Sequence, residues 1–174
     1  MERGTVFTVG ILTISDKGSA GKREDASGLL LHQLVDQLPG KVTVYQVIPD
    51  EKEAIQNQLI SFSDRWKVDL VLTTGGTGVS PRDVTPEATM QVLDRLIPGM
   101  GEVMRMEGYR KNPKAIISRG IAGVRKQTLI VNLPGSPRAV RENFEILLPA
   151  LPHAIEKMKG DEEDCGIPPR NERV

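Results

Sequence analysis

Short runs of β-branched and other apolar residues alternate along the chain with stretches in which apolar residues recur at helical spacing. The strand-like runs cover residues 6–14, 42–48, 69–73 and 128–132. Helical spacing is found over residues 27–37 and over residues 51–66. A strand–helix–strand–helix–strand order is typical of a parallel sheet with crossover helices on its faces. The pattern therefore predicts an α/β fold, a three-layer sandwich with a mostly parallel central sheet and helices on both faces.

The second half of the chain predicts three more helices. Thr85, which is followed by a proline, fits the N-cap of a helix that ends at Pro98. A second helix is expected over residues 101–110. Ser136, also followed by a proline, begins a long final helix.

The length of 174 residues suits one domain. We expect residues 1–160 to form it and residues 161–174, which are charged and proline-bearing, to be a flexible C-terminal tail. The single cysteine, Cys165, has no partner for an internal disulfide and no Cys or His at metal-ligand spacing. The apolar run at residues 6–14 is too short to span a bilayer. A cytoplasmic location with no membrane contact is therefore expected.

The charge balance argues against nucleic acid as a partner. Twenty-three Lys and Arg offset 23 Asp and Glu, so the net charge is zero. Aromatic residues make up 3% of the chain, too few for a stacking platform. Most of the remaining cations, including Arg119, Arg125 and Arg138, are expected to be solvated.

A glycine-rich segment follows the third predicted strand and carries most of the chemical information. It contains Gly75, Gly76, Thr77 and Gly78. Glycines let backbone N–H groups approach an anion closely, as in phosphate-binding loops. The spacing matches neither the P-loop nor the dinucleotide fingerprint. A tight structural turn explains the glycines equally well, and both interpretations stay open.

Two acidic residues lie at the ends of predicted strands or loops. Asp83 follows the glycine-rich segment and could hold a magnesium ion on phosphate oxygens, or could complement the N-terminus of the next helix. Asp50 ends the second strand and could do the same, or could cap the helix that follows it. Because carboxyl ends of parallel strands meet at one edge, Asp50, Asp83 and the Ser15–Asp16 pair are expected to lie together.

Several motifs in fixed order resemble one family. The sequence between residues 6 and 159 is similar to the MogA-type molybdopterin adenylyltransferases of the MogA/MoaB family, to which the gephyrin G domain is also similar. The resemblance is carried by Ser15-Asp16, Pro49-Asp50, the Thr-Gly-Gly-Thr-Gly loop, Pro81-Arg82-Asp83-Val84-Thr85-Pro86-Glu87-Ala88 and Asn132-Leu133-Pro134-Gly135-Ser136-Pro137.

The resemblance implies transfer of AMP from Mg-ATP to the phosphate of molybdopterin, with release of pyrophosphate. Asp50 and Asp83 fall on the two essential acids of the family, which would hold Mg²⁺. The residues on the nucleotide and phosphate side would be Ser15, Asp16, Gly75, Gly76, Thr77, Gly78, Pro134, Gly135 and Ser136. Ser118 and Asn132 fall where similar proteins contact the pterin, and Arg82 is the cation expected to meet the anionic substrate.

A non-catalytic molybdopterin-binding carrier or scaffold of the MoaB type is the alternative function. The Ser-Pro-Arg-Asp run at residues 80–83 favours the enzyme. By resemblance we also expect a homotrimer, helped by apolar residues at 100–106, and a hand-off of product to a molybdenum-insertion protein. The sequence does not separate a molybdenum pathway from a tungsten pathway.

Overall fold

The computed structural model describes residues 6–160 and contains a six-stranded sheet in the order β2-β1-β3-β6-β5-β4. The strands are β1 (Phe7–Ile14), β2 (Gly40–Ile48), β3 (Leu70–Thr74), β4 (Arg95–Leu96), β5 (Ala122–Arg125) and β6 (Thr128–Leu133). The pairings among β2, β1, β3 and β6 are parallel. The pairings of β5 with β6 and of β4 with β5 are antiparallel. The predicted tail at residues 161–174, with Cys165, lies outside the described residues.

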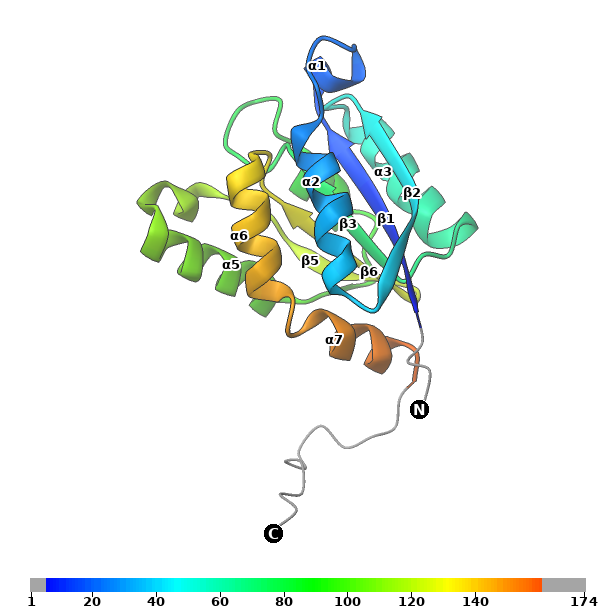
Figure 1. Ribbon diagram of the computed structural model, residues 1–174. Helices are drawn as coiled ribbons and strands as arrows, with labels where there is room; N and C mark the ends of the chain where they lie inside the picture. Colours follow the sequence, from blue (N-terminus) through cyan, green and yellow to red (C-terminus); the bar gives the residue numbers. More distant parts are fainter. Residues whose placement is uncertain (1–5, 161–174) are drawn as a thin grey trace.

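Helices cover both faces of this sheet (Figure 1). They are α1 (Asp16–Ser19), α2 (Ala26–Leu34), η1 (Val35–Gln37), α3 (Lys52–Ile60), η2 (Ser61–Arg65), α4 (Thr85–Met90), α5 (Pro98–Lys111), η3 (Pro113–Ile117), α6 (Pro137–Leu147) and α7 (Leu151–Met158). One apolar cluster joins the sheet to α2, α5, α6 and α7, and a second joins it to α3, η2 and α4. The predicted three-layer α/β sandwich is confirmed.

The period-2 pattern of the central strands explains the two clusters. In β3, Leu70 and Leu72 belong to the first cluster and Val71 to the second. All three are buried, because both faces of the strand are covered by helices. None of the helices in the described part of the chain has the length and apolar character needed to cross a membrane.

The prediction of a helix from Thr85 to Pro98 is wrong at both ends of the helix. Its N-cap is Val84, and α4 already ends at Met90. Pro98 begins α5 instead of ending a helix, because proline fits the first helical turn and drives the preceding residue to extended backbone. Between the two helices lies β4, an edge strand that the sequence analysis missed.

The antiparallel strand β5 was also missed, and the segment after Ser136 forms two helices in place of one long helix. β5 has four residues and includes Gly123, so it lacks a strand-like alternation. It joins β6 through a two-residue turn at Lys126 and Gln127, where Lys126 has a φ of 52°. Ser136 caps α6 as predicted, and its hydroxyl accepts from Ala139 N–H at 3.3 Å. The helix ends at Leu147, and α7 begins separately.

Asp64, in η2, forms an ion-pair cluster near the amino ends of β3 and β6. It accepts two hydrogen bonds from Arg125, at 3.0 and 2.9 Å, and one from Lys126 at 2.7 Å. These cations lower the pKa of Asp64 to about 2. Arg125, with only 18% of its side chain exposed, is therefore not the solvated cation that the sequence suggested.

We expect Asp64→Asn to reduce the free energy of unfolding at pH 7 by about 1 kcal/mol, since the cluster is partly solvated. The folded-state pKa lies below the unfolded value of about 3.9. The contribution is therefore present above about pH 4 and is lost as the pH falls towards about 2. Urea unfolding of both proteins at several pH values tests this. Glu107→Gln, in an exposed pair with Arg110, is the matched control and should change little. An equal effect of the two substitutions would contradict the prediction.

Candidate functional site

The carboxyl ends of the four parallel strands meet at one edge of the sheet. β1 leads into Ser15, β2 into Asp50, β3 into the glycine-rich segment, and β6 into residues 134–136. Ser15 N–H donates to Ile48 O at 2.9 Å, which ties the first two strand ends together. Two cavities of about 300 Å³ each open at this edge, and both are lined by Gly135 and Ser136. Cavities at this edge are where open α/β sheets bind ligands.

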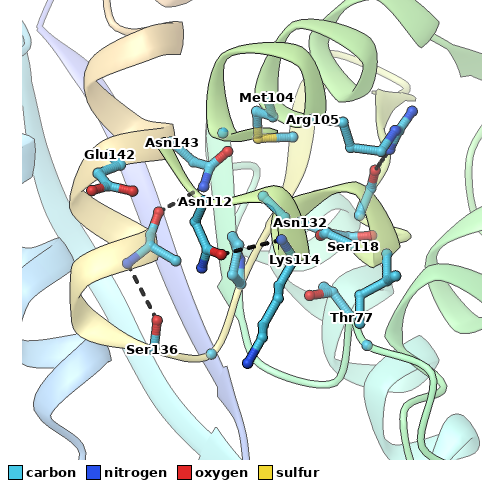
Figure 2. Close-up of a pocket in the computed structure, with 18 of the residues that line it drawn as sticks. Thr77, Met104, Arg105, Asn112, Lys114, Ser118, Asn132, Ser136, Glu142 and Asn143 are labelled. Carbon is cyan, nitrogen blue, oxygen red and sulfur yellow. Dashed lines mark hydrogen bonds between the residues drawn. The ribbon is translucent and has the colours of Figure 1, made fainter. Parts of the chain in front are cut away.

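The first cavity contains the residues expected to contact a pterin. Ser118 and Asn132 line it, together with Thr77 and Gly78 of the glycine-rich segment. Figure 2 shows side chains of α6 on one side of the cavity and Ser118 and Thr77 on the other, with Met104 and Arg105 of α5 above. Polar residues that the sequence analysis did not single out also line it: Arg105, Asn112, Lys114, Glu142 and Asn143. They belong to no motif, so no sequence signal pointed to them.

The amide of Asn132 is already bonded within the protein. Its Nδ2 donates to the hydroxyls of Thr73 and Thr89, at 3.0 Å each, and the residue is fully buried. Both amide hydrogens are therefore used to join β6, β3 and α4. In this structure Asn132 supports the wall of the cavity, and Ser118 is one of the hydroxyl-bearing residues that line it.

The second cavity contains five of the nine residues expected on the nucleotide side, and Asp16 lines neither cavity. Ser15, Gly75 and Gly76 line it with Asp50 and the first residues of α2. Thr77 and Gly78 line the other cavity, so the glycine-rich segment is divided between the two. Pro134 likewise lines only the first cavity, whereas Gly135 and Ser136 lie between them.

The backbone of the segment requires glycine. Gly75 has a φ of 102°, and a Cβ atom there would lie 2.2 Å from Ile14 O. Gly76 has a φ of 64°, and its Cβ would lie 2.2 Å from the hydroxyl oxygen of Thr85. The N–H of Gly75 donates to Leu133 O at 3.3 Å. Gly75 therefore shapes the cavity and does not offer its N–H to a phosphate.

Asp50 is held by Asp16 and does not cap a helix. Asp16 N–H donates to Asp50 Oδ2 at 2.7 Å, and Asp50 N–H donates to Asp16 Oδ1 at 3.0 Å. The N-cap of α3 is Glu51, so the capping interpretation is wrong. Burial raises the pKa of Asp50, and the charges of Asp16 and Asp83 raise it further. The Asp50 carboxylate thus lies partly desolvated among like charges, where a cation would stabilise it.

Arg82 lies beside these acids and does not line the cavity with Ser118. Its guanidinium binds both carboxylate oxygens of Asp16, at 3.1 and 2.9 Å, and Glu51 at 2.8 Å. The pairing lowers the pKa of Asp16. The structure therefore groups Arg82 with the nucleotide-side residues and not with the pterin-side residues.

Asp83 lies in the loop that joins the glycine-rich segment to α4. Its Oδ2 accepts from Ser80 N–H at 2.8 Å, and a Cβ atom at Gly78 would lie 2.8 Å from the same oxygen. Within residues 6–160, no three side chains of His, Cys, Asp or Glu gather as a metal-binding cluster. Magnesium usually takes one or two carboxylates together with substrate phosphates. The pair Asp50 and Asp83, with their mutual repulsion, fits a magnesium ion that arrives with a nucleotide.

Comparison with known proteins agrees with this geometry. The family described as "Probable molybdopterin binding domain" matches residues 10–153. The chain belongs to this molybdopterin-binding family. The resemblance stated from the sequence motifs is confirmed.

Relatives within the molybdopterin-binding family have several names. The chain is 41% identical to a protein of Helicobacter pylori strain 26695 named molybdopterin adenylyltransferase, over 88% of each chain. It is 46% identical to gephyrin of Dictyostelium discoideum, over 86% of this chain and 22% of that protein. The crystal structure of the molybdopterin biosynthesis enzyme MoaB of Thermus thermophilus is 51% identical, with a TM-score of 0.85, and the match covers 90% of this chain and 98% of that one.

Proposed function

We propose that this protein transfers the adenylyl group of ATP to the phosphate of molybdopterin. The observation that carries the proposal is the meeting of two cavities at Gly135 and Ser136. Asp50 lines one of them, and Gly78 lines the other, where the absence of a Cβ leaves room for the Asp83 carboxylate. The shared wall would bring the pterin phosphate in the first cavity next to the α-phosphate of a nucleotide in the second. The name of the Helicobacter pylori relative supports the same reaction.

The reaction needs positioning and charge neutralisation, and no protein nucleophile. An oxygen of the molybdopterin phosphate attacks the α-phosphorus of ATP in line. The bond from that phosphorus to the oxygen of the β-phosphate breaks, and pyrophosphate leaves. Ser136, the N-cap of the 11-residue helix α6, would present its own N–H to a phosphate oxygen at the shared wall, since Pro137 has no N–H and the Ala139 N–H donates to the Ser136 hydroxyl.

Asp50 and Asp83 would hold Mg²⁺, which is expected with ATP. When bound there, magnesium neutralises developing charge on the phosphate oxygens. The role of the protein is to orient the two carboxylates. The Asp16 N–H orients the carboxylate of Asp50, and the Ser80 N–H orients that of Asp83.

Formation of adenylyl-molybdopterin and pyrophosphate from molybdopterin and ATP tests the proposal. Equal amounts of both products, dependent on Mg²⁺ and abolished by EDTA, are the expected result. Molybdopterin binding without either product would favour the second candidate, a non-catalytic carrier or scaffold. Asp50 and Asp83 speak against that candidate, because two carboxylates near a phosphate repel it unless a cation is present.

We further propose that the protein is a homotrimer and passes its product to a molybdenum-insertion protein. An exposed apolar face on α5 and η3 supports self-association: Met106 is 61% exposed, Tyr109 49% and Ile116 60%. Met100 and Met104, in contrast, belong to the core.

Sedimentation equilibrium should therefore give three times the chain mass of 19.1 kDa. Met106→Lys places a charge on the apolar face and should shift the protein towards the monomer, because burying an unpaired charge is costly. Lys52→Ala, in α3 on the far face of the sheet, should leave the oligomeric state unchanged. A monomeric native protein would contradict the trimer without affecting the proposed reaction.

A further inference from the structure

Arg119 joins the wall of the first cavity to the segment that contains Asp83. It lies between Ser118 and Gly120, both of which line the cavity. Its backbone N–H donates to Thr77 O at 2.8 Å. Its side chain is 35% exposed and bonded within the protein, so Arg119 is not one of the solvated cations.

The guanidinium of Arg119 bonds three groups of one segment. Nε donates to Gly78 O at 2.7 Å, and Nη2 donates to Asp83 O at 2.5 Å. Nη1 pairs with the carboxylate of Glu87 in α4. The planar fork of arginine spreads five N–H donors over three nitrogen atoms, whereas the three donors of lysine all lie on one nitrogen.

The bond to Asp83 has a specific geometry. Arg119 contacts the backbone carbonyl of Asp83, whereas the carboxylate of Asp83 accepts from Ser80 N–H. The contact therefore fixes the backbone at Asp83 without neutralising its carboxylate through a direct ion pair. A carboxylate that must hold a cation needs this combination, because a direct arginine partner would compete with the metal.

We propose that Arg119 is a positioning residue for the transfer reaction. It holds residues 78–83 against the wall of the pterin-side cavity and so sets the position of Asp83 relative to a bound pterin phosphate. This inference rests on the proposed function. Since a displacement of about 1 Å from the productive geometry can cost about 100-fold in rate, loss of the contact should reduce turnover more than binding.

Kinetics of Arg119→Lys and Arg119→Ala test the proposal. We expect kcat to fall by about 10- to 100-fold in both variants, with the dissociation constant for molybdopterin nearly unchanged and a higher Mg²⁺ concentration needed for half-maximal activity. Arg119→Lys should resemble Arg119→Ala, because charge alone does not replace the fork. Glu87→Gln, which keeps both carbonyl bonds, should have a small effect. Arg141→Ala, at an exposed arginine of α6, is the matched control and should have none.

Amide hydrogen exchange gives a second readout that needs no substrate. The Ser80 N–H donates to the carboxylate of Asp83, and the Asp83 N–H donates to Ser80 O. The exchange rates of these two N–H groups therefore report how well ordered the loop is. In Arg119→Lys and Arg119→Ala we expect exchange in residues 78–83 to be at least about fivefold faster than in the native protein, and no change in Arg141→Ala.

The outcomes separate the two proposals. Native protein without transfer activity would overturn the proposed reaction, while hydrogen exchange would still test whether Arg119 orders residues 78–83. Unchanged exchange in residues 78–83, or a loss of molybdopterin binding equal to the loss of kcat, would overturn the positioning role. If Arg119→Ala does not fold, the kinetics and hydrogen exchange of Arg119→Lys test the positioning role.

Discussion

Asp83→Asn is expected to reduce adenylyl transfer by about 10²- to 10³-fold, the usual loss when a group that neutralises developing charge is removed. Asparagine keeps an oxygen that can accept from Ser80 N–H, so the loop should keep its shape. It lacks the charge that would hold Mg²⁺. Molybdopterin binding should persist, because Asp83 lines neither cavity.

Transfer assays and molybdopterin titrations of the Asp83→Asn protein check this expectation. Glu53→Gln, at an exposed acid of α3, is the control and should behave as the native protein. Loss of transfer and binding together in a folded Asp83→Asn protein would contradict a metal-holding role. Full activity would remove Asp83 from the site.

Asp50→Asn should lower transfer by about 10²-fold while making the ligand-free protein no less stable. Both effects follow from removing the negative charge of Asp50. Because burial raises the pKa of Asp50, its ionised form is disfavoured in the fold, and this cost is present at pH 7 and disappears as the pH falls below the raised pKa. Asparagine removes the cost and can still accept from Asp16 N–H.

Thermal unfolding in EDTA, alongside the transfer assay, measures both effects of Asp50→Asn. A melting temperature equal to or above the native value with strongly reduced transfer is the expected pair of results. A group that only supported the fold would give the opposite pair, lower stability and normal turnover. The opposite pair would therefore refute the role given to Asp50.

Much of the fold was predictable because its central strands have a strong local signal. β1, β3 and β6 are buried on both faces and are rich in β-branched and other apolar residues. The edge of the sheet was not predictable in the same way. β4 has two exposed residues, and its ends are fixed by bonds from Asp94 N–H and Ile97 N–H to carbonyls of β5. Such pairing depends on the distant strand and leaves no periodic pattern in the sequence.

Some residues of the candidate site could likewise be predicted from the sequence, and others could not. Asp50, Ser15 and the glycine-rich segment could be placed at one edge because parallel strands end together. Arg119 could not, because its acceptors are backbone carbonyls 36 and 41 residues away. The partners of Arg82 were missed for the same reason, since Asp16 lies 66 residues from it. Side-chain contacts with backbone carbonyls, and contacts between surface residues far apart in the sequence, leave no motif in the sequence.

The fate of labelled phosphate tests the central claim most directly. The native protein is incubated with molybdopterin and ATP labelled in either the α- or the γ-phosphate. We expect the α label in the pterin product and the γ label in pyrophosphate, no labelled product with EDTA, and yields lowered by about 10²- to 10³-fold with Asp83→Asn. Appearance of the γ label in the pterin product would mean phosphoryl transfer, and unlabelled pterin would mean binding alone. Either result would contradict adenylyl transfer at this site.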